Sequence, residues 1–346
     1  MDPKVIAITG SSGKTTTKEM MFSVLAENFR THKSILNHNN EIGLCQTLMS
    51  MPEDTEFLVV EMGMRGLGEI ELLSKYAEPD FAIITNVGTA HIGRLGSLEN
   101  IAKAKCEIVK YLRPDGTLVA FDDNLIKNFC GQKGRQIFYG KNYQILEITE
   151  NSIKFLYEEN EYELPVNGEF NVINSIAAIE IGKLAGLDAE KIRHGLLKYL
   201  PVGERGRVIN TDKNLKIIAD YYNANPDSMK ASITSVISTY PDFEITLVLG
   251  DMGELGEYEN QLHQEIGEFL SQKSFFQLVT VGEKAKIIAD SVKNKNITLK
   301  TFMNNKEASV YLKNIRTEKS LILLKASRSM KFEEIAEELQ KVKTKA

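Results

Sequence analysis

Residues 8–17, ITGSSGKTTT, join an apolar run to a helical pattern through a turn rich in glycine and serine. Glycine lets the backbone approach a phosphate closely, and the first turn of a helix offers unpaired N–H groups. Lys14 is placed to reach the terminal phosphates of a nucleotide, and the Thr15 hydroxyl is placed to bind Mg²⁺. The alternative is a turn that only caps a helix, but the strand before it and the three threonines favour a nucleotide site.

The spacing of this turn differs from the usual phosphate-binding loop. The position five residues before Gly13 is Ile8, where that loop has a glycine. The shorter pattern G-x-x-G-K-T-T still keeps the lysine and the hydroxyl, so we expect it to keep the function.

Apolar, β-branched runs alternate with helical patterns along the chain, which predicts helices packed over mostly parallel sheets. The expected strands are residues 5–9, 57–60, 81–85, 117–121, 215–219, 245–249, 278–281 and 321–324. Residues 136–166 contain short alternating segments and indicate an antiparallel hairpin region. A helix is expected at residues 172–184, and another at residues 229–240 with Asp227 available as its cap.

The stretch PVGERGR, residues 201–207, is rich in glycine, proline and charge and suits a domain boundary. We therefore predict two α/β domains. Residues 1–203 form a P-loop ATP-binding domain, and residues 204–346 form a Rossmann-like domain, with a hinge near residues 202–206.

Composition restricts the class of protein. The chain has 346 residues, 42% of them hydrophobic, and a net charge of −5, so broad binding to nucleic acid is not expected. Cys45, Cys106 and Cys130 show no metal-site spacing and are expected to be reduced thiols. Neither a membrane span nor a signal peptide is expected, so the predicted location is the cytoplasm.

Other polar residues near strand ends are candidates for the same site. Glu61 directly follows an apolar run, where a metal-binding acid is expected, although acids at strand ends are common. Asn86 and His91 follow another strand, at the sheet edge where α/β proteins bind ligands. A histidine in such a loop can equally be structural, and spacing alone does not distinguish Lys105 from Lys103.

Taken in order, the motifs resemble the Mur ligase family, ATP-dependent ligases that assemble the peptidoglycan peptide. The resemblance runs from residue 8 to 330 and is closest to the branch that adds D-alanyl-D-alanine to a UDP-linked muramoyl tripeptide. The stretches that carry it are ITGSSGKTTTKEM, NNEIG, VVEMGMRGLGEI, TNVGTAHIGRLGS, AKCEI, NGEFNVINSIAAI, GRVIN, YYNANPDSM, LGDMGELG and KASRSM.

The resemblance implies roles for particular residues. Lys14, His91, Lys105 and Arg207 are the expected catalytic residues, and Lys105 resembles a lysine that can become a carbamate. ATP is expected to contact Gly10, Ser12, Gly13, Lys14, Thr15, Thr16, Asn171, Asn174, Arg207, Asp220, Asn223 and Asn225. Magnesium is expected at Thr15, Glu61, His91 and Lys105, and substrate at Asn39, Asn40 and Ser327.

Several positions depart from the family pattern. Phe170 stands where histidine is usual, Ala219 where an acid is more common, and Ala326 where glycine is usual. Cys45 follows NNEIGL where the family usually continues Leu-Pro. The phosphate turn also begins near residue 1, whereas this branch carries an N-terminal domain that binds the UDP-sugar. Either that domain lies outside this sequence, on the same or a separate chain, or the protein is a two-domain relative.

The implied reaction is amide-bond formation through an acyl phosphate. A substrate carboxylate attacks the γ-phosphate of ATP, and an incoming amine then displaces the phosphate. One alternative is a Mur-like ligase with other substrates, as in folylpolyglutamate synthases or secondary metabolism. Further alternatives are a nucleotide-binding partner that has lost catalysis, and a simple P-loop kinase or GTPase.

Overall fold

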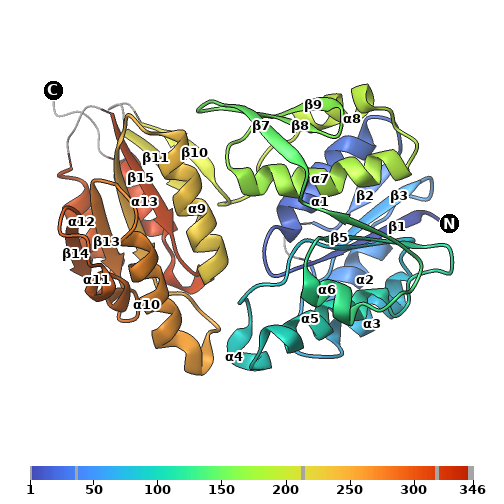
Figure 1. Cartoon of the computed structure of the whole chain (residues 1–346), viewed down its shortest axis with the longest axis horizontal. Helices are drawn as coiled ribbons and strands as arrows, with labels where there is room; N and C mark the ends of the chain where they lie inside the picture. The colour runs from blue at the N-terminus through green and yellow to red at the C-terminus, as the bar shows by residue number, and fades with distance from the viewer. Residues whose placement is uncertain (1, 36–37, 212–214, 316–318, 342–346) are drawn as a thin grey trace. The chain divides into compact units, whose positions relative to one another are not determined.

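The computed structural model describes residues 2–35, 38–211, 215–315 and 319–341 (Figure 1). The chain divides into two compact units, Met1–Leu200 and Pro201–Ala346. The sequence placed the boundary between residues 203 and 204. Both units are mixed α/β with a mostly parallel central sheet, which is the fold class expected from the sequence.

A six-stranded parallel sheet forms the centre of the first unit. Its central strands are apolar and buried on both faces, as parallel strands covered by helices usually are. The strand order is β2 (Thr31–Lys33), β3 (Phe57–Glu61), β1 (Lys4–Thr9), β4 (Phe81–Ile84), β5 (Thr117–Phe121) and β6 (Arg135–Tyr139).

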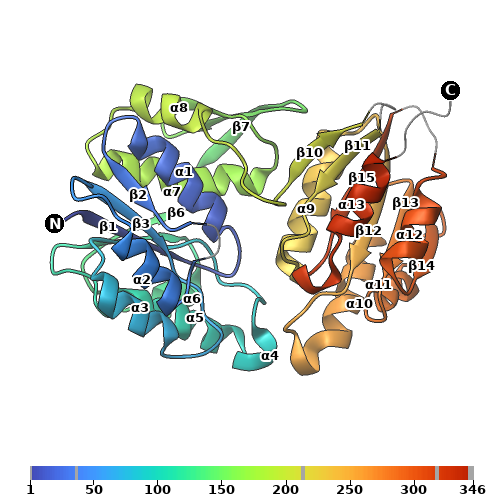
Figure 2. The same ribbon diagram turned by 180° about the vertical axis from the view of Figure 1, so that it is seen from behind.

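Helices cover both faces of this sheet (Figures 1 and 2). One face carries α1 (Lys14–Ala26), α7 (Glu169–Leu184) and α8 (Ala189–Leu197), which pack against one another in the main core. The other carries α2 (Glu41–Met49), α3 (Glu69–Ala77), α5 (Leu98–Cys106) and α6 (Asn124–Phe129). Two short helical segments, α4 (Ile92–Leu95) and η1 (Glu107–Val109), flank α5 in the chain.

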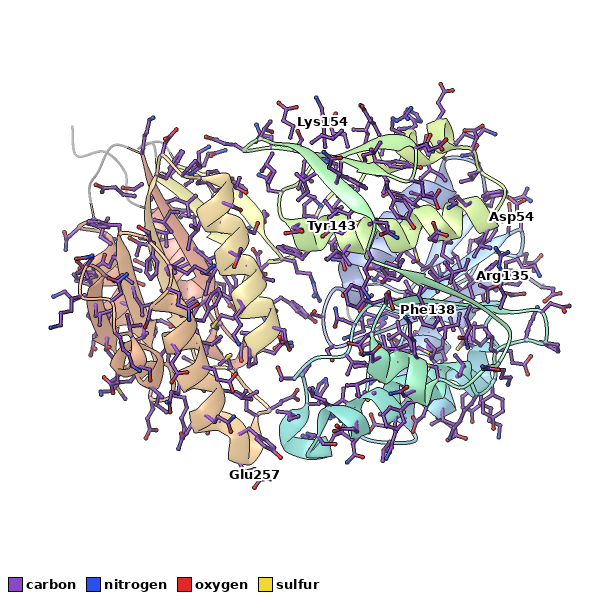
Figure 3. The ribbon with its side chains drawn as sticks, viewed as in Figure 1. Asp54, Arg135, Phe138, Tyr143, Lys154 and Glu257 are labelled. Atoms are coloured by element: carbon purple, nitrogen blue, oxygen red, sulfur yellow. A yellow bond between two sulfur atoms is a disulfide. The ribbon has the colours of Figure 1, made fainter. Side chains whose placement is uncertain are left out.

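The antiparallel region is smaller than the sequence predicted. Strands β7 (Tyr143–Ile148), β8 (Ile153–Tyr157) and β9 (Asn160–Leu164) form the expected antiparallel sheet. The prediction was wrong for β6, which pairs in parallel with β5, because its Tyr139 buries its ring in the main core. Figure 3 labels Arg135 and Phe138 on β6 and Tyr143 on β7, whose hydroxyl donates to Glu169 Oε1 of α7 at 2.6 Å.

The second unit has its own six-stranded sheet, parallel except for its first edge strand. The order is β10 (Arg207–Asn210), β11 (Leu215–Ala219), β15 (Ser320–Lys325), β12 (Glu244–Gly250), β13 (Gln277–Val281) and β14 (Thr298–Phe302). The helices are α9 (Pro226–Thr239), α10 (Glu259–Leu270), α11 (Ala285–Ser291), α12 (Asn305–Leu312) and α13 (Glu333–Gln340), with η2 (Gly256–Tyr258) and η3 (Arg328–Met330).

The sequence did not predict strands β2, β10 and β14. All three lie away from the centre of their sheets and carry polar or exposed side chains, as in THK of β2 and TLKTF of β14. The apolar run that reveals a central strand is absent from such strands. Their pairing is decided by neighbouring strands rather than by local composition.

Two local predictions are corrected by the structure. The N-cap of α9 is Asn225 rather than Asp227, because Asn225 Oδ1 accepts from Ser228 N at 2.8 Å in a capping box. Cys106 and Cys130 are joined in a disulfide, so the prediction of three reduced thiols was wrong. They meet because α5 packs against α6, whereas Cys45 is free and exposed. Among the described residues, no helix is long and apolar enough to cross a bilayer.

Candidate nucleotide and metal site

Two glycines shape the turn between β1 and α1. Gly10 has φ 154°, and a Cβ atom there would lie 1.8 Å from Thr85 Oγ1. Gly13 caps α1 with φ 80°, and its Cβ would lie 2.5 Å from Asn174 Oδ1. No side chain fits at either position, because Thr85 and Asn174 occupy the space, so the turn requires glycine at both. Asn174, from α7, also reaches this turn, which agrees with the role expected for it.

The loop after the neighbouring strand β4 braces the turn. Ser12 N donates to Asn86 Oδ1 at 2.9 Å, and Asn86 Nδ2 donates to Ser12 O at 3.1 Å and Ser12 Oγ at 3.0 Å. Gly88 N donates to Ser11 Oγ at 2.9 Å. Since β1 and β4 are adjacent and parallel, their carboxyl ends meet at one edge of the sheet. Asn86 therefore fixes the shape of the turn.

Lys14 folds over the turn that it follows. Its Nζ donates to Gly10 O at 2.7 Å, while the side chain remains half-buried. Thr16, in the same first turn of α1, is also half-buried. A lysine in this position places positive charge beside the helix N-terminus, where a phosphate group is already favoured.

Hard oxygen ligands lie next to the turn. Thr15 Oγ1 donates to Glu61 Oε2 at 2.7 Å, and Asn39 Nδ2 donates to Glu61 Oε1 at 3.0 Å. Glu61 ends β3 and is only 4% exposed. Mg²⁺ is usually held by one or two protein oxygens together with substrate phosphates. The hydroxyl and the carboxylate fit that ion, as the sequence led us to expect.

Lys105 is a deeply buried charged side chain near Lys14. It lies on α5 and is 1% exposed. Burial, and then the charge of the neighbouring Lys14, lower the pKa of Lys105 well below its usual value. Lys103 on the same helix is exposed, so the structure makes the distinction between the two lysines that spacing could not make.

His91 lies in the loop that follows β4. It is the N-cap of α4 and has φ 66°, a left-handed conformation that is uncommon outside glycine. Residues in such conformations cluster at functional sites, where the surrounding structure maintains them.

Two further asparagines occupy helix starts. Asn171, in the first turn of α7, is buried and donates from Nδ2 to Asn167 O at 2.6 Å. Asn40 is the N-cap of α2, and its Oδ1 accepts from Gly43 N at 2.9 Å. The first supports the end of the helix that carries Asn174, and the second anchors the segment that carries Asn39.

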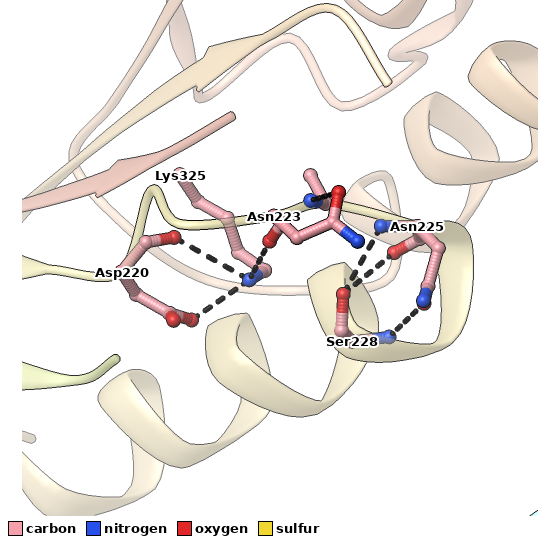
Figure 4. Close-up of polar contacts among 6 residues, drawn as sticks. Asp220, Asn223, Asn225, Ser228 and Lys325 are labelled. Atoms are coloured by element: carbon pink, nitrogen blue, oxygen red, sulfur yellow. Dashed lines mark hydrogen bonds and ion pairs between the residues drawn. The ribbon is translucent and has the colours of Figure 1, made fainter. Parts of the chain in front are cut away.

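In the second unit, the predicted residues cluster around a buried lysine (Figure 4). Lys325 Nζ lies 2.8 Å from Asp220 Oδ2 and donates to Asn223 O at 3.3 Å. Lys325 ends β15 and is 2% exposed. Asp220 directly follows β11, the strand that pairs with β15. The Asp220 carboxylate and the loop of Asn223 are therefore fixed by one buried cation.

The remaining predicted residues of this unit have contacts with partners other than Lys325. Arg207 begins β10, is exposed, and contacts Glu204 Oε1 at 3.2 Å. Ser327 is buried, and its Oγ accepts from Gly253 N at 2.6 Å. The side chain of Asn225 caps α9, so its Oδ1 already has a partner within the protein.

Among the residues that the structure describes, no group of three or more His, Cys, Asp or Glu could hold a metal ion. The proposed magnesium ligands therefore form a sparse set in which Thr15 and Glu61 are in contact. Sequence reasoning missed Lys18, Ser34 and Lys325, all of them buried. A buried lysine within a motif gives no signal that distinguishes it from an exposed lysine in sequence.

Comparison with known proteins agrees with this arrangement. The Mur ligase middle domain model matches residues 8–182, and the Mur ligase glutamate ligase domain model matches residues 204–328. The UDP-N-acetylmuramoyl-tripeptide--D-alanyl-D-alanine ligase of Bacillus subtilis is 40% identical over 97% of this chain and 76% of its own length. The enzyme of that name from Synechocystis is 34% identical over 94% of this chain and 72% of its own length.

Solved structures show the same relationship. MurF from Acinetobacter baumannii matches with a TM-score of 0.90 and 31% identity, covering 97% of this chain and 76% of that one. MurF from Thermotoga maritima, in complex with ADP, has a TM-score of 0.87 and 28% identity, covering 99% and 80%. A folylpolyglutamate synthase from Mycobacterium tuberculosis, at 14% identity and a TM-score of 0.71, shares the fold. With both domain models matched and a 40% identical relative aligned over 97% of this chain, the chain belongs to the Mur ligase family.

Proposed function

We propose that this protein is an ATP-dependent ligase that adds D-alanyl-D-alanine to a UDP-N-acetylmuramoyl tripeptide in peptidoglycan synthesis. The observation that carries the proposal is the contact between Thr15 and Glu61 beside a turn that only glycine can form. Relatives with that activity in their names align over almost the whole chain and support the choice of substrates.

ATP binds at the turn between β1 and α1 in this proposal. The backbone N–H groups of the turn and the Lys14 ammonium contact its phosphates, and Asn174 and Asn171 lie at the start of α7 for the adenine. Thr15 and Glu61 would hold Mg²⁺, which would supply positive charge beside the phosphates that the carboxylate attacks. His91 and Lys105 are proposed for a second ion.

The chemistry has two steps. The tripeptide carboxylate attacks the γ-phosphorus, the bond to the β–γ bridging oxygen breaks, and ADP leaves. The amine of D-alanyl-D-alanine then attacks the acyl carbon, inorganic phosphate leaves with the former carboxylate oxygen, and the amine loses a proton. Lys14 is placed to stabilise charge on the transferred phosphoryl group in the first step.

Lys105 is proposed to act as a carbamate, which supplies an anionic oxygen where an ammonium could not bind a metal. Its burial beside Lys14 supports this role, because both conditions favour the neutral amine that reacts with carbon dioxide. A Lys105→Ala variant should lose activity. Added bicarbonate should raise the activity of the protein that has Lys105 and should not raise that of the variant. Full activity in that variant would rule out the carbamate.

Asn39, Asn40 and Ser327 are proposed for the substrates, and Arg207, Asp220, Asn223 and Asn225 for the nucleotide. The fixed Asp220 loop supports the latter assignment. Ala326, which replaces a usual glycine, is the position where choice of acceptor could differ. Cytoplasmic location and a separate substrate-binding chain stay predictions.

The test measures release of ADP and phosphate with Mg²⁺ and ATP, in the presence of both substrates and of each alone. We expect release that requires both, with the pentapeptide product in the mass spectrum, and strongly reduced release from Lys14→Ala. A protein that binds ATP and releases nothing contradicts the proposed substrates. A panel of other carboxylates and amines then tests the Mur-like alternative.

A further inference from the structure

Lys18 is a buried lysine to which the proposed reaction gives no role. It lies on α1, one helical turn after Lys14, and is 0% exposed. Its Nζ donates to Ser34 O at 2.8 Å and lies 3.3 Å from Glu19 Oε1. A buried ammonium is costly unless it is paired and hydrogen-bonded, so these contacts indicate a selected arrangement.

The carbonyl that Lys18 holds belongs to a residue that supports Glu61. Ser34 directly follows β2, and its N–H donates to Val59 O at 2.9 Å. Its hydroxyl accepts from Glu61 N at 3.1 Å. One buried residue therefore connects the Lys18 ammonium to the backbone of the proposed magnesium ligand.

Asn39 is a further residue that contacts Glu61. Asn39 Nδ2 donates to Glu61 Oε1, and Asn39 O accepts from Gly63 N at 2.7 Å. A Cβ atom at Gly63 would lie 2.8 Å from Asn39 Cγ, so the contact is close. Lys18 also attracts Glu61 electrostatically. Lys18 thus acts on Glu61 through charge and through Ser34, and Asn39 contacts the Glu61 carboxylate directly.

We propose that Lys18 is a positioning residue for the metal–nucleotide site, holding Ser34 and thereby Glu61 and Asn39 in the arrangement that binds the metal of metal–ATP. The inference rests on the proposed function, because it takes Glu61 to be a metal ligand. Lys18 does not contact substrate in this account. Removing its ammonium releases the Ser34 carbonyl and the electrostatic attraction to Glu61.

The test compares Lys18→Met with the unmodified protein by titrating Mn²⁺ in the presence of ADP, followed by electron paramagnetic resonance. Residues that orient metal ligands typically contribute about 10–100-fold to metal affinity. We expect Mn²⁺ affinity to fall about tenfold and the KM for Mg²⁺–ATP to rise by a similar factor, with a smaller change in kcat.

Lys33→Met is the matched control. Lys33 precedes Ser34 and pairs with Glu19, but its ammonium makes no contact with Ser34 or Glu61 among the described hydrogen bonds and ion pairs. Mn²⁺ affinity should be unchanged in this variant. An equal loss of Mn²⁺ affinity in Lys18→Met and Lys33→Met would assign the effect to general packing around Ser34 and would overturn the inference.

Ser34→Ala keeps the proposal testable if Lys18→Met does not fold. It removes only the hydroxyl that accepts from Glu61 N and should weaken Mn²⁺ binding in the same direction by a smaller factor. If Lys18→Met folds and its Mn²⁺ affinity is unchanged, the inference is overturned. If only Ser34→Ala folds, unchanged Mn²⁺ affinity in that variant overturns it. An unmodified protein that binds no Mn²⁺–ADP would contradict the proposed function as well.

Discussion

The carboxyl edges of the two parallel sheets are built in different ways. At the edge of the first sheet, the turn before α1 is shaped by glycines, and its polar partners come from distant parts of the chain, Glu61, Asn86 and Asn174 among them. At the second, Lys325 joins Asp220 and the Asn223 loop, and Asn225 caps a helix. The first edge presents the N-terminus of α1, where an anion is favoured, whereas the second uses its cation to fix its own loop.

The comparison teaches that a shared architecture does not imply a shared chemistry. Both edges carry a lysine. Lys14 begins helix α1 and is half-buried, whereas Lys325 ends strand β15 and is buried in an ion pair. We therefore expect the loss of Lys14 to reduce catalysis with little effect on stability. The loss of Lys325 should reduce stability, and it should reduce activity only through the Asp220 loop that this lysine holds.

The largest expected effect comes from Lys14→Ala. Loss of a preorganised charge at the reacting group typically costs about 10²–10³-fold in rate, so kcat for ligation should fall by that order. Thermal unfolding should be almost unchanged, because Lys14 is half-buried and at the start of a helix. Kinetics and a melting curve on the same preparation make the comparison, and Lys103→Ala on α5 is the control. A rate within threefold of the unmodified protein, roughly a change of 0.7 kcal/mol, would contradict the assignment.

Reduction of the Cys106–Cys130 disulfide should destabilise the first unit only. The bridge closes a loop with a sequence separation of 24 residues, and the second unit contains no cysteine. A loop of that length corresponds to about 3 kcal/mol of stabilisation in the chain-entropy account. Cys130→Ser should lower the unfolding free energy of the first unit by that order, measured by denaturant titration. When the chain without substitutions is unfolded in denaturant and no reductant is present, thiol titration should detect only Cys45. Three reactive thiols would show that the bridge is absent.

Lys325→Met should destabilise the second unit. It leaves the Asp220 carboxylate without its buried partner, and breaking a buried pair typically costs about 3–5 kcal/mol. Since Asp220 is partly exposed, we expect about 2 kcal/mol, a value discounted for solvent screening. Denaturant titration should show the loss, and the double variant with Asp220→Asn should recover part of it. A loss of Mn²⁺–ADP affinity without any loss of stability would contradict the contrast between the two edges.

The smallest expected effect is on the pH dependence of the second unit. His263, buried on α10, accepts from Met252 N at its Nε2 (3.0 Å), and its Nδ1 lies 2.7 Å from Glu259 O. Burial lowers the pKa of His263, and Lys284 acts in the same direction, whereas the charges of Asp251 and Glu259 oppose it. The unfolded chain therefore binds a proton more readily than the folded one. Stability should be full above the unfolded pKa of about 6.5 and should decrease as the pH falls below it.

Denaturant titrations at several pH values check this sign, with His263→Gln as the comparison. The variant should lose the part of the pH dependence that His263 causes. A His263→Gln protein with an unchanged pH profile would assign the dependence to other groups.

The sequence predicted the central parts of both sheets and the turn at Lys14, because buried apolar runs and glycine spacing are local signals. It also predicted that Thr15 and Glu61 belong to one site. Thr15 lies in the helix that follows one parallel strand, and Glu61 lies at the end of the neighbouring strand. It could not predict β2 or β14, whose polar side chains pair through their neighbours. The resemblance added Asn174, which only folding brings to Gly13.

Other features depend on tertiary structure alone. Burial singles out Lys105 from Lys103 and gives Lys18 and Lys325 their partners. The Cys106–Cys130 bridge depends on the packing of α5 against α6. Motif spacing contains no information on burial. For this reason the sequence left the choice between Lys105 and Lys103 open and did not single out Lys18 or Lys325.

The central claim is that the tripeptide carboxylate is activated as an acyl phosphate at the first edge. The most direct measurement uses UDP-muramoyl tripeptide labelled with ¹⁸O in its terminal carboxylate, together with ATP, Mg²⁺ and D-alanyl-D-alanine. The account predicts that each phosphate released from fully labelled substrate contains one ¹⁸O atom, because a carboxylate oxygen leaves with the phosphate. Phosphate without ¹⁸O, released while the amide forms, would contradict it.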